Sequence, residues 1–146
     1  MMVVMFYILV AVLLPGRMSA ISSPTLVGQI KETIVKVRTG ETYAMARTYG
    51  AEHLADLTAK VNPSEIDDET FGNIVSLLDT PNDSVRAWVA ASLGNLGTRA
   101  KPAIPALLKV LAEVDCLRVD ASSAGFIRTA IKKMGVKPPP PPQCNY

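Results

Sequence analysis

The stretch from Val75 to Gly97, VSLLDTPNDSVRAWVAASLGNLG, constrains the fold most, because it holds two apolar helical segments on either side of a short turn. Residues 79–82 form that turn, with a proline that stops the first helix and an asparagine that can cap the second. We predict helices over 67–78 and 84–96, with Gly97 ending the second in a left-handed conformation. The residues expected on their core faces fall at helical spacing: Phe71, Ile74, Val75 and Leu78, then Val85, Val89, Ser92, Leu93 and Leu96.

The apolar stripe on the second of these helices separates core positions from surface positions. Leu93 lies within the stripe, so we expect its side chain to be buried. Ala87 lies opposite the stripe at about 100° per residue, so we expect it at the surface and Ala87→Ser to be almost neutral.

A looser copy of the same helical pair follows between Pro102 and Gly135. Leu111 follows Leu78 by 33 residues, and Gly135 follows Gly97 by 38 residues. The offset grows because the copy has a longer internal turn, within residues 112–120. Repeated helical pairs bury apolar faces against one another, because a single pair cannot bury its own.

One set of residues in the repeated segment matches a known repeat pattern: Leu77-Leu78-Asp79, Asp83, Val85-Arg86, Ala90, Leu93-Gly94 and Leu96-Gly97. Through these residues the segment resembles a HEAT-like (armadillo-type) helical repeat. The resemblance implies an all-α fold, a short right-handed α-solenoid of about three antiparallel helix pairs. It also implies a ladder of contacts between units, in which Asp83 and Arg86 would take part. Ala121 and Ala124 hold the equivalent positions in the second copy, so the ladder is not expected to continue there.

We expect four regions along the chain. Residues 1–20 are a signal peptide, 21–66 an N-terminal helical pair that caps the stack, 67–137 two HEAT-like repeats, and 138–146 a proline-rich tail. The N-terminal pair is predicted as helices over 25–37 and 42–61. The second of these runs through Met45 and Tyr49 at helical spacing, and Gly50 is its weak point, where it could kink or split.

The first fourteen residues, MMVVMFYILVAVLL, are uncharged and apolar, and Pro15-Gly16 breaks the run ahead of a small residue at Ala20. The run is shorter than the roughly 20 residues that span a bilayer. A cleaved signal is therefore preferred to an uncleaved membrane anchor formed by residues 1–14, and an ordinary core helix comes last. Export would place the protein in the periplasm or outside the cell, with membrane contact only if the segment is retained.

The composition fits one helical domain without a nucleic-acid surface. Hydrophobic residues make up 49% of the 146 residues but aromatic residues only 5%, so the core consists mainly of Ala, Val, Leu and Ile. The net charge is +2; loss of Arg17 with the signal leaves 14 basic and 13 acidic residues, a net charge of +1. This balance does not favour nucleic-acid binding.

The sequence contains no recognisable catalytic constellation. His53 is the single histidine, and a solvated helical position is preferred to a catalytic one. Asp67-Asp68-Glu69 suits the positive end of a helix dipole better than a calcium loop. We therefore expect no enzyme activity, no metal and no cofactor.

Two cysteines, Cys116 and Cys144, are separated by 28 positions. In an oxidising compartment an even number of cysteines favours a bond between them, and in a reducing one they would be unrelated thiols. A bond would clip the stiff run Pro138–Pro142 onto the last helical pair. Metal binding is a poor alternative because no nearby side chain completes a site.

Trp88 is the only tryptophan and lies at the border of its apolar stripe. Phe126 follows it by 38 residues, so the two aromatic residues share one repeat position. They could line a groove for a partner, although packing between neighbouring helices is the preferred interpretation. Asn95 is the third candidate for partner contact.

These observations predict an exported HEAT-repeat adaptor or scaffold that binds an unidentified protein and catalyses nothing. One alternative, implied by the resemblance, is a bilin-lyase-like protein that acts on a chromophore. Another is a structural component of the envelope, anchored by its uncleaved N-terminus.

Overall fold

A computed structural model of the protein describes residues 25–40, 44–116 and 122–144. The predicted signal segment and the predicted ladder position Ala121 lie outside these residues. Within the described ranges every regular element is helical, which confirms the all-α prediction. The elements are α1 (Leu26–Thr39), α2 (Ala44–Thr58), η1 (Pro63–Glu65), α3 (Asp68–Ser76), α4 (Asp83–Asn95), η2 (Gly97–Ala103), α5 (Ile104–Val114) and α6 (Ala124–Lys133), where η marks a 3-10 helix.

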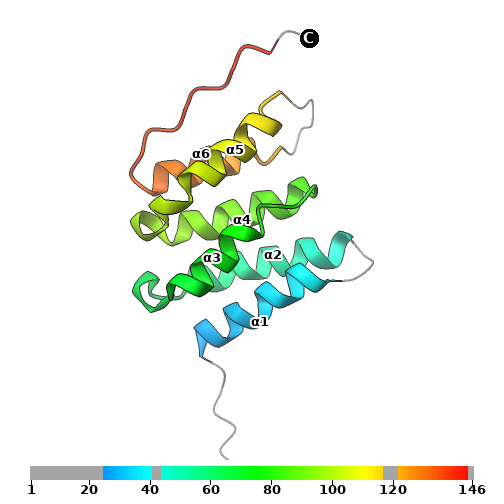
Figure 1. Ribbon diagram of the computed structural model, residues 1–146, viewed down its shortest axis with the longest axis vertical. Coiled ribbons are helices and arrows are strands. Elements are labelled where there is room, and N and C mark those ends of the chain that lie inside the picture. The colour runs from blue at the N-terminus through cyan, green and yellow to red at the C-terminus, as the bar shows by residue number, and fades with distance from the viewer. Residues whose placement is uncertain (1–24, 41–43, 117–121, 145–146) are drawn as a thin grey trace, which may run out of the picture.

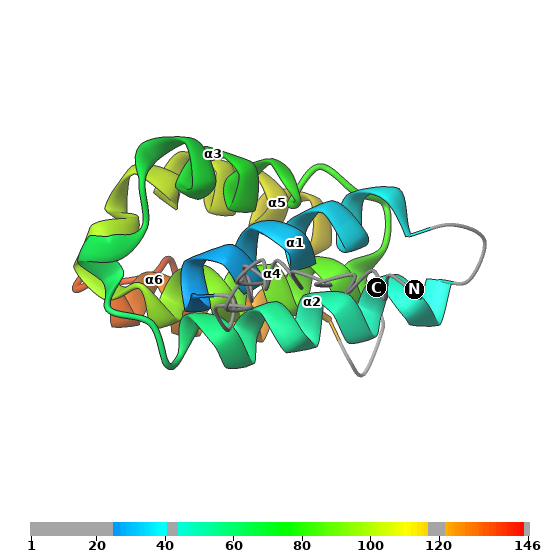
Figure 2. The same cartoon turned by 90° about the horizontal axis from the view of Figure 1, so that it is seen from below.

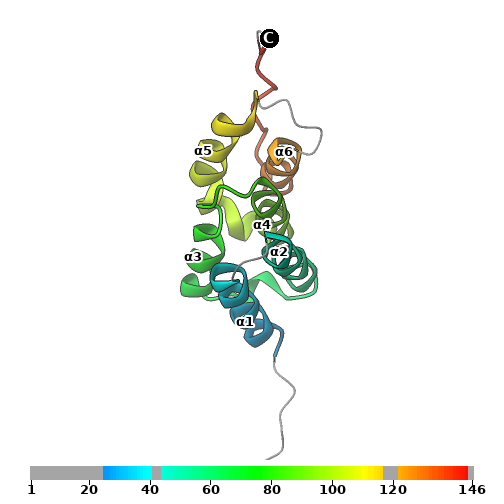
Figure 3. The same cartoon turned by 90° about the vertical axis from the view of Figure 1, so that its right-hand side faces the viewer.

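The helices form a short α-solenoid of three pairs. They are stacked in chain order, with α1 at one end and the extended C-terminal tail at the other (Figure 1). The first helices of the pairs, α1, α3 and α5, form one layer, and the second helices, α2, α4 and α6, form the other (Figure 3). A view along the stack shows α3 and α5 lying over α4 (Figure 2).

The helix ends follow the local signals in the sequence. Asp67 caps α3 by accepting a hydrogen bond from the backbone amide of Thr70 at 2.6 Å, and Asn82 caps α4 by accepting one from Val85. Gly97 has φ +56° and Gly135 has φ +81°, the left-handed conformation that glycine tolerates best. The prediction for Gly97 is therefore confirmed, and its repeat equivalent ends α6 in the same way.

The core runs through all three pairs as one continuous cluster. It is built from aliphatic side chains and alanines, with Phe71 as its only buried aromatic side chain among the described residues. Leu93 is completely buried, as its place in the stripe predicts. The largest buried side chains include Ile30, Leu54, Ile66, Ile74, Leu93, Leu96, Leu107, Leu111, Ile127, Ile131 and Met134.

The surface position predicted for Ala87 is wrong, because only 5% of this residue is exposed. The residue belongs to α4, which has α2 on one side and α6 on the other within its layer. Helix α4 also packs against α3. A helix enclosed on several sides has no polar face opposite its apolar one, so the stripe understates how much of α4 is buried.

Gly50 does not split the second helix of the N-terminal pair, since α2 continues through it from Ala44 to Thr58. A Cβ atom at position 50 would lie 2.9 Å from Cγ2 of Val37 in α1. Glycine therefore allows α1 and α2 to approach each other closely, and the predicted weak point is a packing contact.

Candidate protein-binding face

The second helices α2, α4 and α6 lie parallel and in a nearly constant register. The Asn95 side chain in α4 donates to the backbone carbonyl of Ala55 in α2, 40 residues earlier. The Lys133 ammonium in α6 donates to the Asn95 side chain from 38 residues later. Asn95, a predicted partner-contact residue, thus links three helices and holds their register.

The repeat offsets of the core positions locate the neighbours of Trp88 on the same surface. Residue 126, 38 positions later, is Phe126, and its ring centre lies 5.8 Å from that of Trp88 with the planes tilted by 60°. Between α2 and α4 the fully buried Leu54 and Leu93 are 39 positions apart, and the residue 39 positions before Trp88 is Tyr49, which is 62% exposed. Tyr49, Trp88 and Phe126, which we call the aromatic row, therefore occupy corresponding positions on three adjacent helices.

The side chains of the aromatic row differ in how much they contribute to the core. Trp88 is half-buried and packs against the core, as the preferred packing interpretation predicts. The Phe126 ring contacts Trp88, and because Phe126 is 42% exposed, much of the ring also faces solvent. The helical pattern gave no sign that Tyr49 is exposed, and Met45 beside it is 65% exposed as well. Comparison with Trp88 at the repeat offset is the signal that identifies Tyr49.

A hollow of about 500 Å³ adjoins the row between α4 and α6. A Cβ at Gly94 would lie only 3.0 Å from Cα of Ala130, so α4 and α6 are in close contact at this hollow. The lining is mainly apolar, with two hydroxyl groups and one ammonium group. It consists of Ala91, Gly94, Ser122, Gly125, Phe126, Thr129, Ala130 and Lys133.

Asp83 and Arg86 both contact the following unit, although through different partners. The Asp83 carboxylate accepts hydrogen bonds from the amide and hydroxyl of Ser123, the residue that precedes α6, at 2.8 and 2.5 Å. The Arg86 guanidinium donates to Glu113 in α5 at 2.8 Å and to the carbonyl of Leu78. The two residues therefore connect the units as separate contacts, and Ser123 is a partner that the sequence comparison did not identify.

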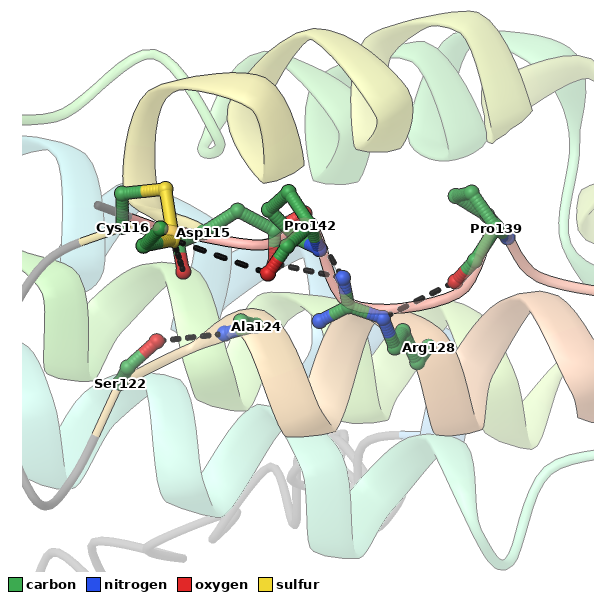
Figure 4. A network of polar contacts seen from close by, with 8 residues as sticks. Asp115, Cys116, Ser122, Ala124, Arg128, Pro139 and Pro142 are labelled. Carbon is green, nitrogen blue, oxygen red and sulfur yellow. Dashed lines mark hydrogen bonds and ion pairs between the residues drawn. A yellow bond between two sulfur atoms is a disulfide. The ribbon is translucent and has the colours of Figure 1, made fainter.

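The structure joins Cys116 and Cys144 in a disulfide, with an Sγ–Sγ distance of 2.03 Å. Beside it, Arg128 of α6 binds both carboxylate oxygens of Asp115, at 2.6 and 2.7 Å, and donates to the carbonyl of Pro139 at 3.1 Å (Figure 4). The Asp115 and Arg128 side chains are only 15% and 17% exposed. The tail is therefore held to the end of the stack by one covalent bond and one polar network.

In the described ranges, no group of three or more His, Cys, Asp or Glu side chains is placed to hold a metal ion. His53 is exposed on α2. The pKa of Asp67 lies well below its ordinary value, because Lys31 donates a hydrogen bond to the carboxylate at 2.9 Å and Thr70 donates another. Asp67 joins the first unit to the second through Lys31 and caps α3. These structural contacts account for its lowered pKa.

Comparison with known proteins identifies the repeat over one segment. The family model of the PBS lyase HEAT-like repeat matches residues 85–113, from α4 through η2 to α5. The chain therefore contains a HEAT-like repeat there, which agrees with the resemblance seen in the sequence. Searches of curated proteins and of solved structures found no significant match. Among the described residues, the longest helices fall short of the length and hydropathy needed to cross a bilayer.

Proposed function

We propose that this protein is an exported, non-catalytic scaffold that binds a protein partner on the face formed by α2, α4 and α6. The observation that carries the proposal is the aromatic row: three aromatic side chains in one register on an exposed face. Aromatic residues are enriched at protein interfaces, where they contribute a large contact area for little conformational entropy.

The helices and the hollow around the aromatic row support its use as a docking surface for a protein. The three side chains of the row stand on helices that are linked by the hydrogen bonds of Asn95 with Ala55 and Lys133. The row is therefore ordered before a partner docks, and docking costs little conformational entropy. The hollow beside Phe126 can accept an apolar side chain, and Thr129 and Lys133 in its lining can bind polar groups of the same partner.

Two features support export. The apolar start of the sequence, followed by small residues, is typical of a secretion signal. Both cysteines are paired in one disulfide, which is the state expected in an oxidising compartment. N-terminal sequencing of the mature protein would distinguish a cleaved signal from a retained anchor: a start near Ile21 supports export and cleavage, and a start at Met1 contradicts cleavage.

A second candidate function is binding or transfer of a bilin-type chromophore. The match to the PBS lyase HEAT-like repeat favours it, and a hollow of about 500 Å³ falls within the usual range for small-ligand sites. Titration of the protein with a linear tetrapyrrole tests this candidate through the absorption band of the chromophore. An unchanged spectrum would exclude it.

Cross-linking and affinity capture from envelope extract test the main proposal. We expect wild-type protein to capture a defined partner, and Tyr49→Ala or Phe126→Ala to reduce that capture at least several-fold. Both side chains are exposed, so the variants should remain folded. Val35→Ala is the matched control, because Val35 is an exposed apolar residue on α1, in the other layer. Equal capture by wild type, both row variants and the control would contradict the proposal.

A further inference from the structure

The proline tail lies at the end of the stack and is attached to it at several points. Its beginning follows the left-handed Gly135, its middle accepts a hydrogen bond from Arg128 at Pro139, and its end is bonded by the disulfide to Cys116, two residues after the end of α5. Between these anchors Pro139–Pro142 are exposed. A proline run is already extended and stiff, so binding it costs little conformational entropy.

The aromatic row has the chemistry that recognises such a run. Grooves that bind proline-rich segments are lined by aromatic rings on which the pyrrolidine rings pack. Proline residues have no backbone N–H group, so the carbonyl groups of a proline run need donors from outside the run. Tyrosine hydroxyl and tryptophan N–H groups can donate such hydrogen bonds. Tyr49, Trp88 and Phe126 provide these rings, and Tyr49 is exposed on α2, at one end of the row of second helices.

The dimensions of the two surfaces agree. Adjacent packed helices lie about 8–10 Å apart, so a row that crosses three helices spans about 16–20 Å. A polyproline helix rises about 3.1 Å per residue, so Pro138–Gln143 spans roughly 19 Å. The run is therefore long enough to cross the whole row.

The charges also agree and indicate the direction of docking. Lys137 precedes the prolines and is exposed. On α2, Glu52 and Asp56 lie about one and two turns beyond Tyr49, with Asp56 exposed. A tail that lies across the row with Lys137 over α2 would pair its ammonium with these carboxylates.

The tail cannot reach the aromatic row of its own chain, because the disulfide and Arg128 hold it against α5 and α6 (Figure 4). We propose that the proline tail of one copy of this protein docks on the aromatic row of a second copy. The inference rests on the same face as the proposed function and names one occupant for it. The contact joins two different surfaces, the tail of one copy and the aromatic row of the other. After one such contact, one copy still has a free row and the other a free tail. In a dimer that exchanges tails reciprocally, both are occupied.

Sedimentation velocity over a concentration series of the oxidised protein tests the inference. We expect reversible association beyond the monomer, weakened about tenfold or more by Tyr49→Ala and by the double tail variant Pro140→Ser/Pro141→Ser. Val35→Ala should associate like wild type. The sole tryptophan lies in the row, so its emission gives a second readout when the synthetic peptide KPPPPPQ, residues 137–143, is added. We expect the peptide to shift that emission and to dissociate the assembly.

The outcomes separate this inference from the proposed function. A protein that stays monomeric at every concentration, with or without an emission shift on peptide addition, overturns docking between copies. An emission shift in that monomer would indicate that the row binds a proline-rich segment of another protein. Partner capture that depends on Tyr49 would still support the scaffold function, because that experiment uses extract and not a second copy of this chain.

Discussion

The helices α4 and α6 occupy the same position in successive units but differ in their surroundings. Helix α4 lies between α2 and α6, and it is buried around most of its circumference. Helix α6 has α4 on one side only, and its buried residues are limited to Ile127, Ala130 and Ile131. On the side where another repeat would lie, α6 meets the proline tail, bound through Arg128.

The difference shows how a short repeat stack can end. An interior helix is stabilised by neighbours on both sides, whereas an end helix leaves apolar surface and polar groups without a neighbour. Here a tail without helical structure lies where a further unit would pack, and it is fixed by Cys144 and the Asp115–Arg128 pair. Interior stability should therefore depend on packing, and end stability on the disulfide.

Truncating the interior core should have the largest effect. We expect Leu93→Ala to lower the free energy of unfolding by about 2–5 kcal/mol, because the side chain is completely buried in α4. Ile131→Ala, at the equivalent position of α6, should cost less, since fewer surrounding helices lose contacts. Chemical denaturation of both variants measures the difference, with Ser84→Ala on the exposed start of α4 as control. A larger loss for Ile131→Ala would contradict the distinction between interior and end.

Opening the disulfide should have the next largest effect and should act at the end of the stack. Loop-closure entropy predicts a loss of about 3 kcal/mol for Cys116→Ser/Cys144→Ser. Thermal melting followed by circular dichroism should show a lower Tm with nearly unchanged helicity before melting. Loss of most helicity in the folded variant would show that the clip supports the whole stack. Two free thiols in wild-type protein purified under non-reducing conditions would show that the clip does not form.

Two glycines provide a paired test of the contact between α4 and α6. Gly94→Leu should destabilise the protein by about 1–3 kcal/mol, because even a Cβ would lie 3.0 Å from Cα of Ala130. Gly125→Leu should be neutral or slightly stabilising, since no atom lies within 4 Å of its added Cβ and leucine favours helix more than glycine. Equal effects on the free energy of unfolding would refute close packing at Gly94.

The smallest effect concerns the opposite end of the stack, where ion pairs take the place of the covalent clip. Lys31 and Thr70 lower the pKa of Asp67 below its ordinary value of 3.8. Asp67 therefore contributes stability above about pH 4, and this contribution is lost as the pH falls through the lowered pKa. Asp67→Asn should unfold with a weaker pH dependence below pH 4 than wild type. Parallel curves of Tm against pH for the two proteins would contradict this assignment.

Much of the fold could be predicted from local signals. The proline turn, the caps at Asp67 and Asn82, and the glycine at position 97 mark helix ends by backbone chemistry that needs no tertiary information. The cysteine pair followed from the even count and the stiff tail between them.

The exposure of individual helix positions could not be predicted in the same way. Ala87 was assigned to the surface, and Met45 and Tyr49 to a helical core pattern, because periodicity treats a helix as packed on one side. The register between α2, α4 and α6 decides which positions face outward, and it depends on long-range contacts such as Asn95 with Ala55. The aromatic row was therefore only partly visible in the sequence, as Trp88 and Phe126 without Tyr49.

Hydrogen exchange measured on oxidised and reduced protein tests the central claim most directly. The account predicts that the backbone amides of α4 exchange slowest and keep their protection after reduction, because packing on both sides protects them. Protection of α6 should fall when the bond between Cys116 and Cys144 is reduced. Equal loss of protection in α4 and α6, or no loss in α6, would contradict the claim that the clipped tail replaces a missing repeat at the end of the stack.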